Sequence, residues 1–121
     1  MKKISLFLGF FLLFAGISLF AQQPKIKKAT ISIPTVQCGM CKTKIESMVP
    51  KYVDGLVSIN VNYKTKKAMV SYYPDRTNIE ELKAAIANAG YDADDVTANP
   101  DSYKKLPTCC KKPEDRGKPA N

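Results

Sequence analysis

The chain has 121 residues, a length that suits one domain and excludes two domains of ordinary size. It carries a net charge of +8 and no histidine, which weighs against a Cys/His zinc site and against a histidine general base. The basic residues are spread along the chain without interleaved aromatic residues, so we expect no nucleic-acid partner.

Residues 1–21 are typical of a secretory signal peptide. Residues 1–3 are Met-Lys-Lys, and residues 4–20 form an apolar run without a charged residue. We therefore expect cleavage after Ala21 and a periplasmic or secreted protein. The alternative is an uncleaved membrane anchor, because the apolar run approaches the length that spans a bilayer. Residues 22–28 then form a polar lead-in to the folded part.

The next segments alternate between strand and helix patterns. Residues 29–36 alternate apolar and polar side chains, which predicts a half-buried strand. A helical pattern begins at Met40 and is expected to end near Pro50, since proline cannot continue a helix interior. Residues 56–62 and 67–73 alternate again, and their short connection predicts an antiparallel hairpin.

The second helix has the clearest boundary signals. Thr77 followed by Glu80 fits a capping box, so Thr77 is the predicted N-cap, and Gly90 supplies the C-terminal stop. Residues 92–97 predict a short edge strand. This order predicts an α+β, ferredoxin-like βαββαβ sandwich, a four-stranded antiparallel sheet with two helices on one face. Residues 98–121 lose periodicity and predict a flexible basic tail.

The four cysteines form two tight pairs, Cys38/Cys41 and Cys109/Cys110. The first pair lies between a strand and a helix, so both thiols share one loop. The helix start and the nearby Lys42 should favour thiolate over thiol. Two thiolates without histidine suit a soft, low-coordinate ion, so the sequence predicts Cu(I) first and Hg(II) second.

The same Cys-Gly-Met-Cys sequence leaves other interpretations open. The main alternative is a small extracytoplasmic thiol–disulfide redox protein, since thioredoxin-like enzymes also use a thiolate at a helix start. However, the chain after Cys41 is too short for a thioredoxin-like sheet. A structural Cys38–Cys41 disulfide is also open, although so small a loop gives little stability. A Zn(II) site with four thiolates ranks lower, because the tail would have to fold back onto the loop.

The second pair and the loop methionine are weaker candidates. Adjacent cysteines rarely bridge each other, because disulfide geometry is demanding. Cys109 and Cys110 are therefore a candidate auxiliary metal pair, with an intermolecular link or an unused pair as alternatives. Met40 is the methionine placed near enough to the loop to touch a bound ion.

Four features together carry a resemblance to a family. They are the Cys-x-x-Cys after the first strand, the amphipathic helix that follows, the strand Gly-Leu-Val-Ser-Ile-Asn-Val at 55–61 and Ala-Gly-Tyr at 89–91. Over residues 29–97 the chain resembles the heavy-metal-associated domain, the ferredoxin-like module of copper chaperones, metal-ATPase amino-terminal domains and periplasmic mercury-binding proteins. A signal peptide with a single domain is most similar to the periplasmic mercury-binding layout.

The resemblance implies that Cys38 and Cys41 bind the metal, and it places Tyr91 at the family's aromatic position near the metal loop. Two features depart from the family pattern. Val36 stands where the family usually has methionine, two residues before the first cysteine, and the cysteine pair in the tail has no counterpart.

These observations predict a non-enzymatic metal carrier. We expect it to capture one soft ion on Cys38 and Cys41 and to carry or buffer it. The ion would then pass by thiolate exchange to a membrane metal transporter or another carrier. We expect a monomer, with a metal-bridged dimer as the alternative.

Overall fold

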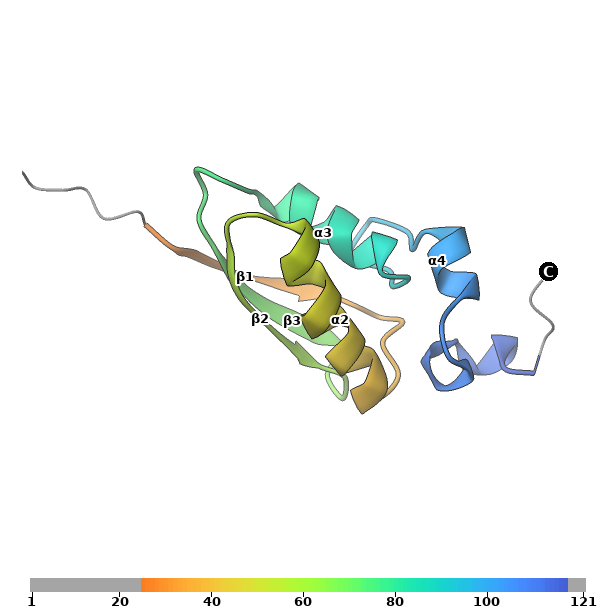
Figure 1. Ribbon diagram of the computed structural model, residues 1–121. Coiled ribbons are helices and arrows are strands. Elements are labelled where there is room, and N and C mark those ends of the chain that lie inside the picture. Colours follow the sequence, from red (N-terminus) through yellow and green to blue (C-terminus); the bar gives the residue numbers. More distant parts are fainter. Residues whose placement is uncertain (1–24, 118–121) are drawn as a thin grey trace, which may run out of the picture.

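A computed structural model describes residues 25–117 (Figure 1). The predicted signal peptide, residues 1–21, lies outside the described residues. Within the described part, no helix has the length and apolar character needed to cross a bilayer. The elements in chain order are β1 (Lys27–Ser32), α2 (Gly39–Tyr52), β2 (Leu56–Asn62), β3 (Lys67–Tyr72), α3 (Ile79–Asn88), α4 (Pro100–Lys104) and two 3₁₀ turns, η1 (Thr108–Cys110) and η2 (Pro113–Asp115).

The sheet has three antiparallel strands in the order β1-β3-β2. In the central strand, Ala68 lies opposite Ile31 of β1 and Val61 of β2, and all three side chains are buried. Both α2 and α3 lie on one face of the sheet (Figure 1). In β1 and β3 the alternating strand pattern therefore directs one set of apolar side chains toward the helices, as predicted, whereas Val57 of β2 is exposed beside a register shift between Leu56 and Ser58.

The core fills the space between this sheet face and the two helices. Each helix has apolar residues at helical spacing, so that one of its faces is apolar and packs against the core. The central buried side chains are Ile31, Ile33, Ile45, Val49, Val61, Val70, Leu82 and Ile86.

Helix α2 continues past Pro50 and ends at Tyr52. Proline removes one helical hydrogen bond, but in the last turn the remaining ladder still closes, with the Val53 N–H donating to the Val49 carbonyl oxygen at 3.2 Å. The buried Val49 holds this last turn against the core. The proline therefore lies inside the helix and does not end it at once.

The N-cap of α3 is Asn78, and the prediction of Thr77 was wrong by one residue. The Asn78 side-chain oxygen accepts a hydrogen bond from the Glu81 N–H at 3.0 Å. The Thr77 hydroxyl is buried and donates instead to the Glu81 carboxylate at 2.8 Å. Both residue types can cap, and asparagine competes well with threonine for that position.

The predicted fourth strand, residues 92–97, is not present as a ladder among the described residues. The segment forms only a bridge between Ala93 and Val96. Asp94 adopts a left-handed backbone conformation, with φ at 49°, which interrupts an extended strand. It still lies along β1, because Ser32 and Asp94 exchange two hydrogen bonds of 2.8 Å. The sheet is thus three-stranded where four strands were predicted.

Residues 98–117, which we call the C-terminal arm, contain α4, η1 and η2, where the sequence predicted no regular structure. Asn99 caps α4 by accepting hydrogen bonds from two backbone N–H groups, and Pro100 occupies the first helical position. Leu106 and Cys110 are buried in the core cluster. Leu106 packs against Gly90, where φ is 107° and a Cβ atom would approach Leu106 to 3.2 Å.

Candidate metal centre

The Cys38/Cys41 pair lies where the chain enters α2. Cys38 is the N-cap residue with extended backbone dihedrals, and Cys41 occupies the first turn. Their Sγ atoms are 3.5 Å apart. Cys41 is on the buried face of the helix, whereas Cys38 is half-buried and closer to solvent. The two thiols therefore share the strand-to-helix junction, as the sequence predicted, and the structure adds that they differ in accessibility.

The helix start favours the ionised form of Cys38. Burial opposes ionisation, but hydrogen bonds from the backbone N–H groups of Cys41 and Met40 outweigh it. The thiols of Cys41 and Cys109 act in the same direction, and the pKa of Cys38 falls to about 7. A substantial fraction of Cys38 is therefore thiolate, the form that binds metal, near neutral pH.

Lys42 makes its contacts elsewhere. Its Nζ donates to the Glu46 carboxylate at 2.7 Å and to the Val61 carbonyl oxygen at 2.9 Å. The same carboxylate accepts the Val61 N–H at 2.8 Å, so Lys42 and Glu46 join α2 to β2. The groups that hydrogen-bond the Cys38 thiolate are backbone N–H groups and thiols, and Lys42 serves to anchor the helix.

The C-terminal arm brings the second cysteine pair to the same place. The Sγ atoms of Cys38, Cys109 and Cys110 all lie within 4.8 Å of one another. The Cys109 Sγ also lies 3.5 Å from the Met40 Sδ, so the predicted near-site methionine touches the second pair. Cys110 is buried, and this burial, reinforced by the Cys41 thiol, raises the pKa of Cys110 far above its usual range.

Tyr91 forms the inner wall behind the thiols. Its side chain is fully buried, and its hydroxyl has no hydrogen-bond partner of ordinary geometry among the described residues. Burial raises the pKa of Tyr91, and the adjacent thiols of Cys110 and Cys41 raise it further. The predicted near-site aromatic residue therefore lies beside the buried thiols and keeps that side of the cluster away from water.

Residues 30–92, slightly more than half of the chain, match the heavy-metal-associated domain family. The chain belongs to this family.

Known relatives fall into transporters and small metal-handling proteins. The chain is 40% identical over 68 residues to a copper-exporting P-type ATPase of Staphylococcus haemolyticus, covering 56% of this chain and 8% of that protein. It therefore spans less than a tenth of this relative's length.

Two solved structures share the fold over nearly their whole length. Oxidized MerP from Ralstonia metallidurans CH34 is 26% identical, with a TM-score of 0.53, 57% of this chain covered and 94% of that chain. The CopZ metallochaperone is 28% identical, with a TM-score of 0.52 and coverage of 55% and 98%. The heavy-metal-associated domain is thus present as a whole unit, and the C-terminal arm follows it.

Val36 stands at the position, two residues before Cys38, where the family usually has methionine. Its side chain is fully buried in the core cluster. Its carbonyl oxygen accepts a hydrogen bond from the Lys66 Nζ at 2.9 Å. The Thr35 hydroxyl accepts the Asp92 N–H at 3.0 Å, on the other side of the loop. Two contacts from distant segments therefore hold the metal loop in place.

These loop anchors were missed by the sequence analysis. Lys66 lies in the hairpin turn with φ at 58°, and Asp92 follows the second helix, so neither is near the loop along the chain. The left-handed backbone of Lys66 is seen only in the structure, so the sequence offers no local signal for where its side chain reaches.

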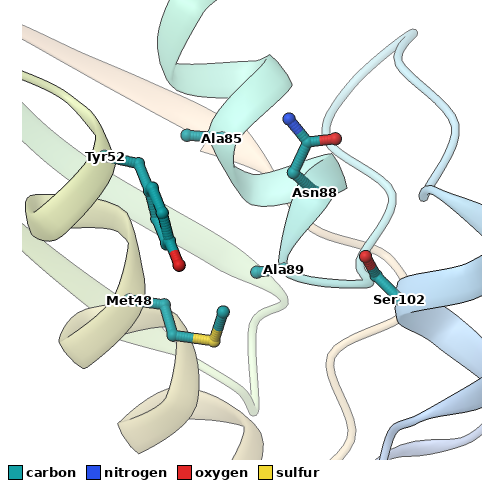
Figure 2. Close-up of a pocket in the computed structure, with 6 residues that line it drawn as sticks. All are labelled: Met48, Tyr52, Ala85, Asn88, Ala89 and Ser102. Carbon is teal, nitrogen blue, oxygen red and sulfur yellow. The ribbon is translucent and has the colours of Figure 1, made fainter.

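A separate hollow of about 290 Å³ lies between α2 and α3. Figure 2 shows Met48 and Tyr52 of α2 facing Ala85 of α3 and Ala89, the C-cap of that helix, with Ser102 of α4 at the far side. No cysteine lines this hollow, and Met48 lies two turns along α2 from Cys41. The cysteine cluster is therefore the candidate metal centre, and this hollow is separate from it.

Proposed function

We propose that this chain is a carrier that captures one soft, thiophilic ion on Cys38 and Cys41 and hands it on by thiolate exchange. The observation that carries the proposal is the 3.5 Å pair of sulfurs at the start of α2, where the pKa of Cys38 is lowered to about 7. Such a pair offers a thiolate at neutral pH without a general base.

The donor set selects for soft ions. The cluster contains sulfur ligands only, which suit Cu(I) and Hg(II) better than hard cations. Cu(I) is the first choice, supported by the relative named as a copper-exporting ATPase. Hg(II) is the second choice, because it shares the preference for few thiolate ligands.

Accessibility suits transfer to a partner. Cys38 is half-buried, and the neighbouring Met40 is 57% exposed, so an incoming thiolate can approach the cluster from the Cys38 side. In each exchange one sulfur–metal bond to this chain breaks as one bond to the partner's thiolate forms. No electron is transferred. The partner is a membrane metal transporter or another carrier, and the chain performs no catalysis of its own.

Export is part of this proposal. It rests on residues 1–21, whose basic start and apolar run are typical of a signal peptide. The carrier would then work in the periplasm or outside the cell. Mass spectrometry of the protein secreted from expressing cells, showing a chain that begins at Gln22, is the expected result. A chain that retains Met1 would show that the signal is not cleaved and would favour the membrane-anchored form.

One observation favours a second function. A thiolate with a pKa near 7, next to a buried thiol at 3.5 Å, also suits thiol–disulfide exchange. An insulin-reduction assay separates the two, because a carrier shows no turnover. Sustained insulin reduction that depends on Cys38 would make the protein an oxidoreductase.

Metal titration of the reduced protein tests the carrier function. We expect one Cu(I) per chain in competition with a chromogenic Cu(I) chelator, and loss of tight binding in Cys38→Ser and Cys41→Ser. Met69→Leu is the matched control, because Met69 is a sulfur-bearing side chain 68% exposed on β3. If both cysteine variants bound as tightly as the parent, the ligand assignment would fail.

A further inference from the structure

We infer that Cys109 and Cys110 of the C-terminal arm bind the same ion as Cys38, so that the metal is held by at least three thiolates under a closed arm. This inference rests on the proposed function and deepens it. It assigns ligands outside the domain that matches the family, at residues 30–92.

Distances between the sulfurs carry the first step. With metal–sulfur bonds of about 2.3 Å, sulfurs lie about 4.6 Å apart in a linear complex, about 4.0 Å in a trigonal one and about 3.8 Å in a tetrahedral one. Cys38 and Cys41 are 3.5 Å apart, closer than linear two-coordination requires. The sulfurs of Cys38, Cys109 and Cys110 lie within 4.8 Å of one another, so small movements bring them to trigonal spacing.

The second step is that the arm is built to place these thiols. The Tyr103 hydroxyl accepts the Lys112 N–H at 2.9 Å and donates to Asp115 at 2.7 Å, which ties the two ends of the arm around η1. Arg116 donates to the Cys109 carbonyl oxygen at 3.3 Å. The Cys110 N–H donates to the Pro107 carbonyl oxygen at 2.9 Å, which closes the turn. The pair is therefore positioned by contacts that involve no sulfur.

The Tyr91 hydroxyl gives an independent indication of a ligand. A buried hydroxyl without a well-formed hydrogen bond costs free energy, and among the described residues this one has only the thiols of Cys41 and Cys110 beside it. When a metal ion binds, these thiols lose their protons to water and become sulfur acceptors. Tyr91 can then donate to a metal-bound thiolate, which satisfies the orphaned hydroxyl and stabilises the loaded site.

Closure changes what the carrier does. An ion bound by Cys38 and Cys41 alone is open to exchange. Cys109 and Cys110 belong to the C-terminal arm, which has to move before a partner thiolate can reach the ion. The arm therefore favours retention, and transfer proceeds as the bonds to Cys109 and Cys110 are replaced by bonds to the partner.

X-ray absorption on the Cu(I)-loaded protein counts the sulfur neighbours. We expect at least three in the parent and two in Cys109→Ser/Cys110→Ser. Competition with a Cu(I) chelator should show binding weakened by roughly 10-fold or more, since loss of even an outer-shell group costs about 10–100-fold. Thr108→Ser is the control on η1, because it leaves every sulfur in place, and it should match the parent.

The outcomes separate the two proposals. Equal sulfur numbers and equal affinities in the parent and the Cys109→Ser/Cys110→Ser variant would overturn the inference while leaving the carrier function intact. A parent that binds no Cu(I), or Cys38→Ser and Cys41→Ser variants that bind as tightly, would overturn the carrier function itself. Native mass spectrometry of the loaded parent should show a monomer, and a metal-bridged dimer would overturn the closed arm.

Because Cys110 is buried, its substitution can disturb folding, so a measurement on the unaltered chain is needed as well. Cys109 is only half-buried, so we expect it to react with a maleimide in the metal-free protein. One equivalent of Cu(I) should slow its alkylation strongly. An unchanged rate at Cys109 would contradict the inference without any variant.

Discussion

The two cysteine pairs meet at one point but are held there by different parts of the fold. Cys41 is fully buried in the first turn of α2, whose buried face is part of the core between the sheet and α3. Cys109 and Cys110 belong to the C-terminal arm, in which Leu106 and Cys110 are the buried side chains among the described residues. The first pair is therefore fixed by the domain, and we expect the second to separate from it without unfolding of the sheet.

The two pairs also differ in how readily their thiols ionise. Helix-start hydrogen bonds lower the pKa of Cys38 to about 7, whereas burial raises the pKa of Cys110. Under the proposed function, the first pair supplies the thiolate that captures an ion. We infer that the second pair closes over an ion that is already bound, because the cation would then compensate the cost of a buried thiolate. The proposal thus divides capture and retention between the domain and the arm.

The largest expected effect is removal of the first pair. Cys38→Ser/Cys41→Ser should weaken Cu(I) binding by more than about 100-fold, because even an outer-shell group contributes about 10–100-fold. Competition titration measures this loss, and circular dichroism checks that the fold is retained. Binding within a few-fold of the parent would show that the second pair, and not the first, captures the ion.

Truncating Leu106 should release the arm without unfolding the domain. Leu→Ala in a core costs about 2–5 kcal/mol, and here that cost falls on the packing of Leu106 against Gly90. We expect faster alkylation of Cys110 and faster amide hydrogen exchange in residues 98–117 only. Leu82→Ala, in α3, is the matched comparison and should lower the stability of the whole domain. Similar global unfolding in both variants would mean that arm and domain form one cooperative unit.

The two pairs should also differ in their pH dependence. Because the pKa of Cys38 is lowered to about 7, its thiolate is present above that pH and is lost as the pH falls through about 7. Alkylation of Cys38 in the metal-free protein should reach half its maximal rate near pH 7. Cys110, whose pKa is raised, should remain slow across the neutral range. Mass spectrometry of peptides measures both alkylation rates. The same pH profile at Cys38 and Cys110 would contradict the expected difference in their pKa values.

The smallest expected effect is at Met40, which lies between Cys38 and Cys41 in the sequence and whose side chain contacts Cys109. Its Sδ lies 3.5 Å from the Cys109 Sγ, but a thioether is a weaker ligand than a thiolate. Met40→Leu should change Cu(I) affinity by only a few-fold, and Met69→Leu should leave it unchanged. If Met40→Leu lowered the Cu(I) affinity as much as Cys38→Ser, Met40 would be a metal ligand as important as Cys38.

The sequence predicted the elements whose patterns are local. The helical stripe through Cys41, Ile45 and Val49 and the alternation in β3 were confirmed, because side-chain period and burial go together. In β2 the alternation holds from Ile59 to Val61 and fails at Val57, which is exposed beside a register shift. The family resemblance was also confirmed by the match over residues 30–92.

The errors arose where two local interactions compete or where distant segments meet. Asn78 displaced Thr77 as the N-cap because adjacent residues offered equivalent oxygens. The left-handed backbone of Asp94 interrupted the predicted fourth strand. Strand propensity describes a whole segment and does not predict the conformation of one residue.

The arm was missed for a different reason. Its capping signals at Asn99 and Pro100 are visible in the sequence, but helices this short are stabilised by packing and not by propensity. That packing depends on Leu106 meeting Gly90 and on Cys110 meeting the loop, contacts between distant parts of the chain. The motif Cys38-x-x-Cys41 therefore indicated where the site begins, and the fold was needed to show what lies beside it.

Protection of Cys38 from alkylation by a single equivalent of Cu(I) is the sharpest test of metal capture at the start of α2. In the reduced parent protein at pH 7.5, the half-buried Cys38 thiolate should react readily without metal and almost cease to react once one Cu(I) per chain is added. An alkylation rate at Cys38 that is the same with and without Cu(I) would contradict metal binding at this loop.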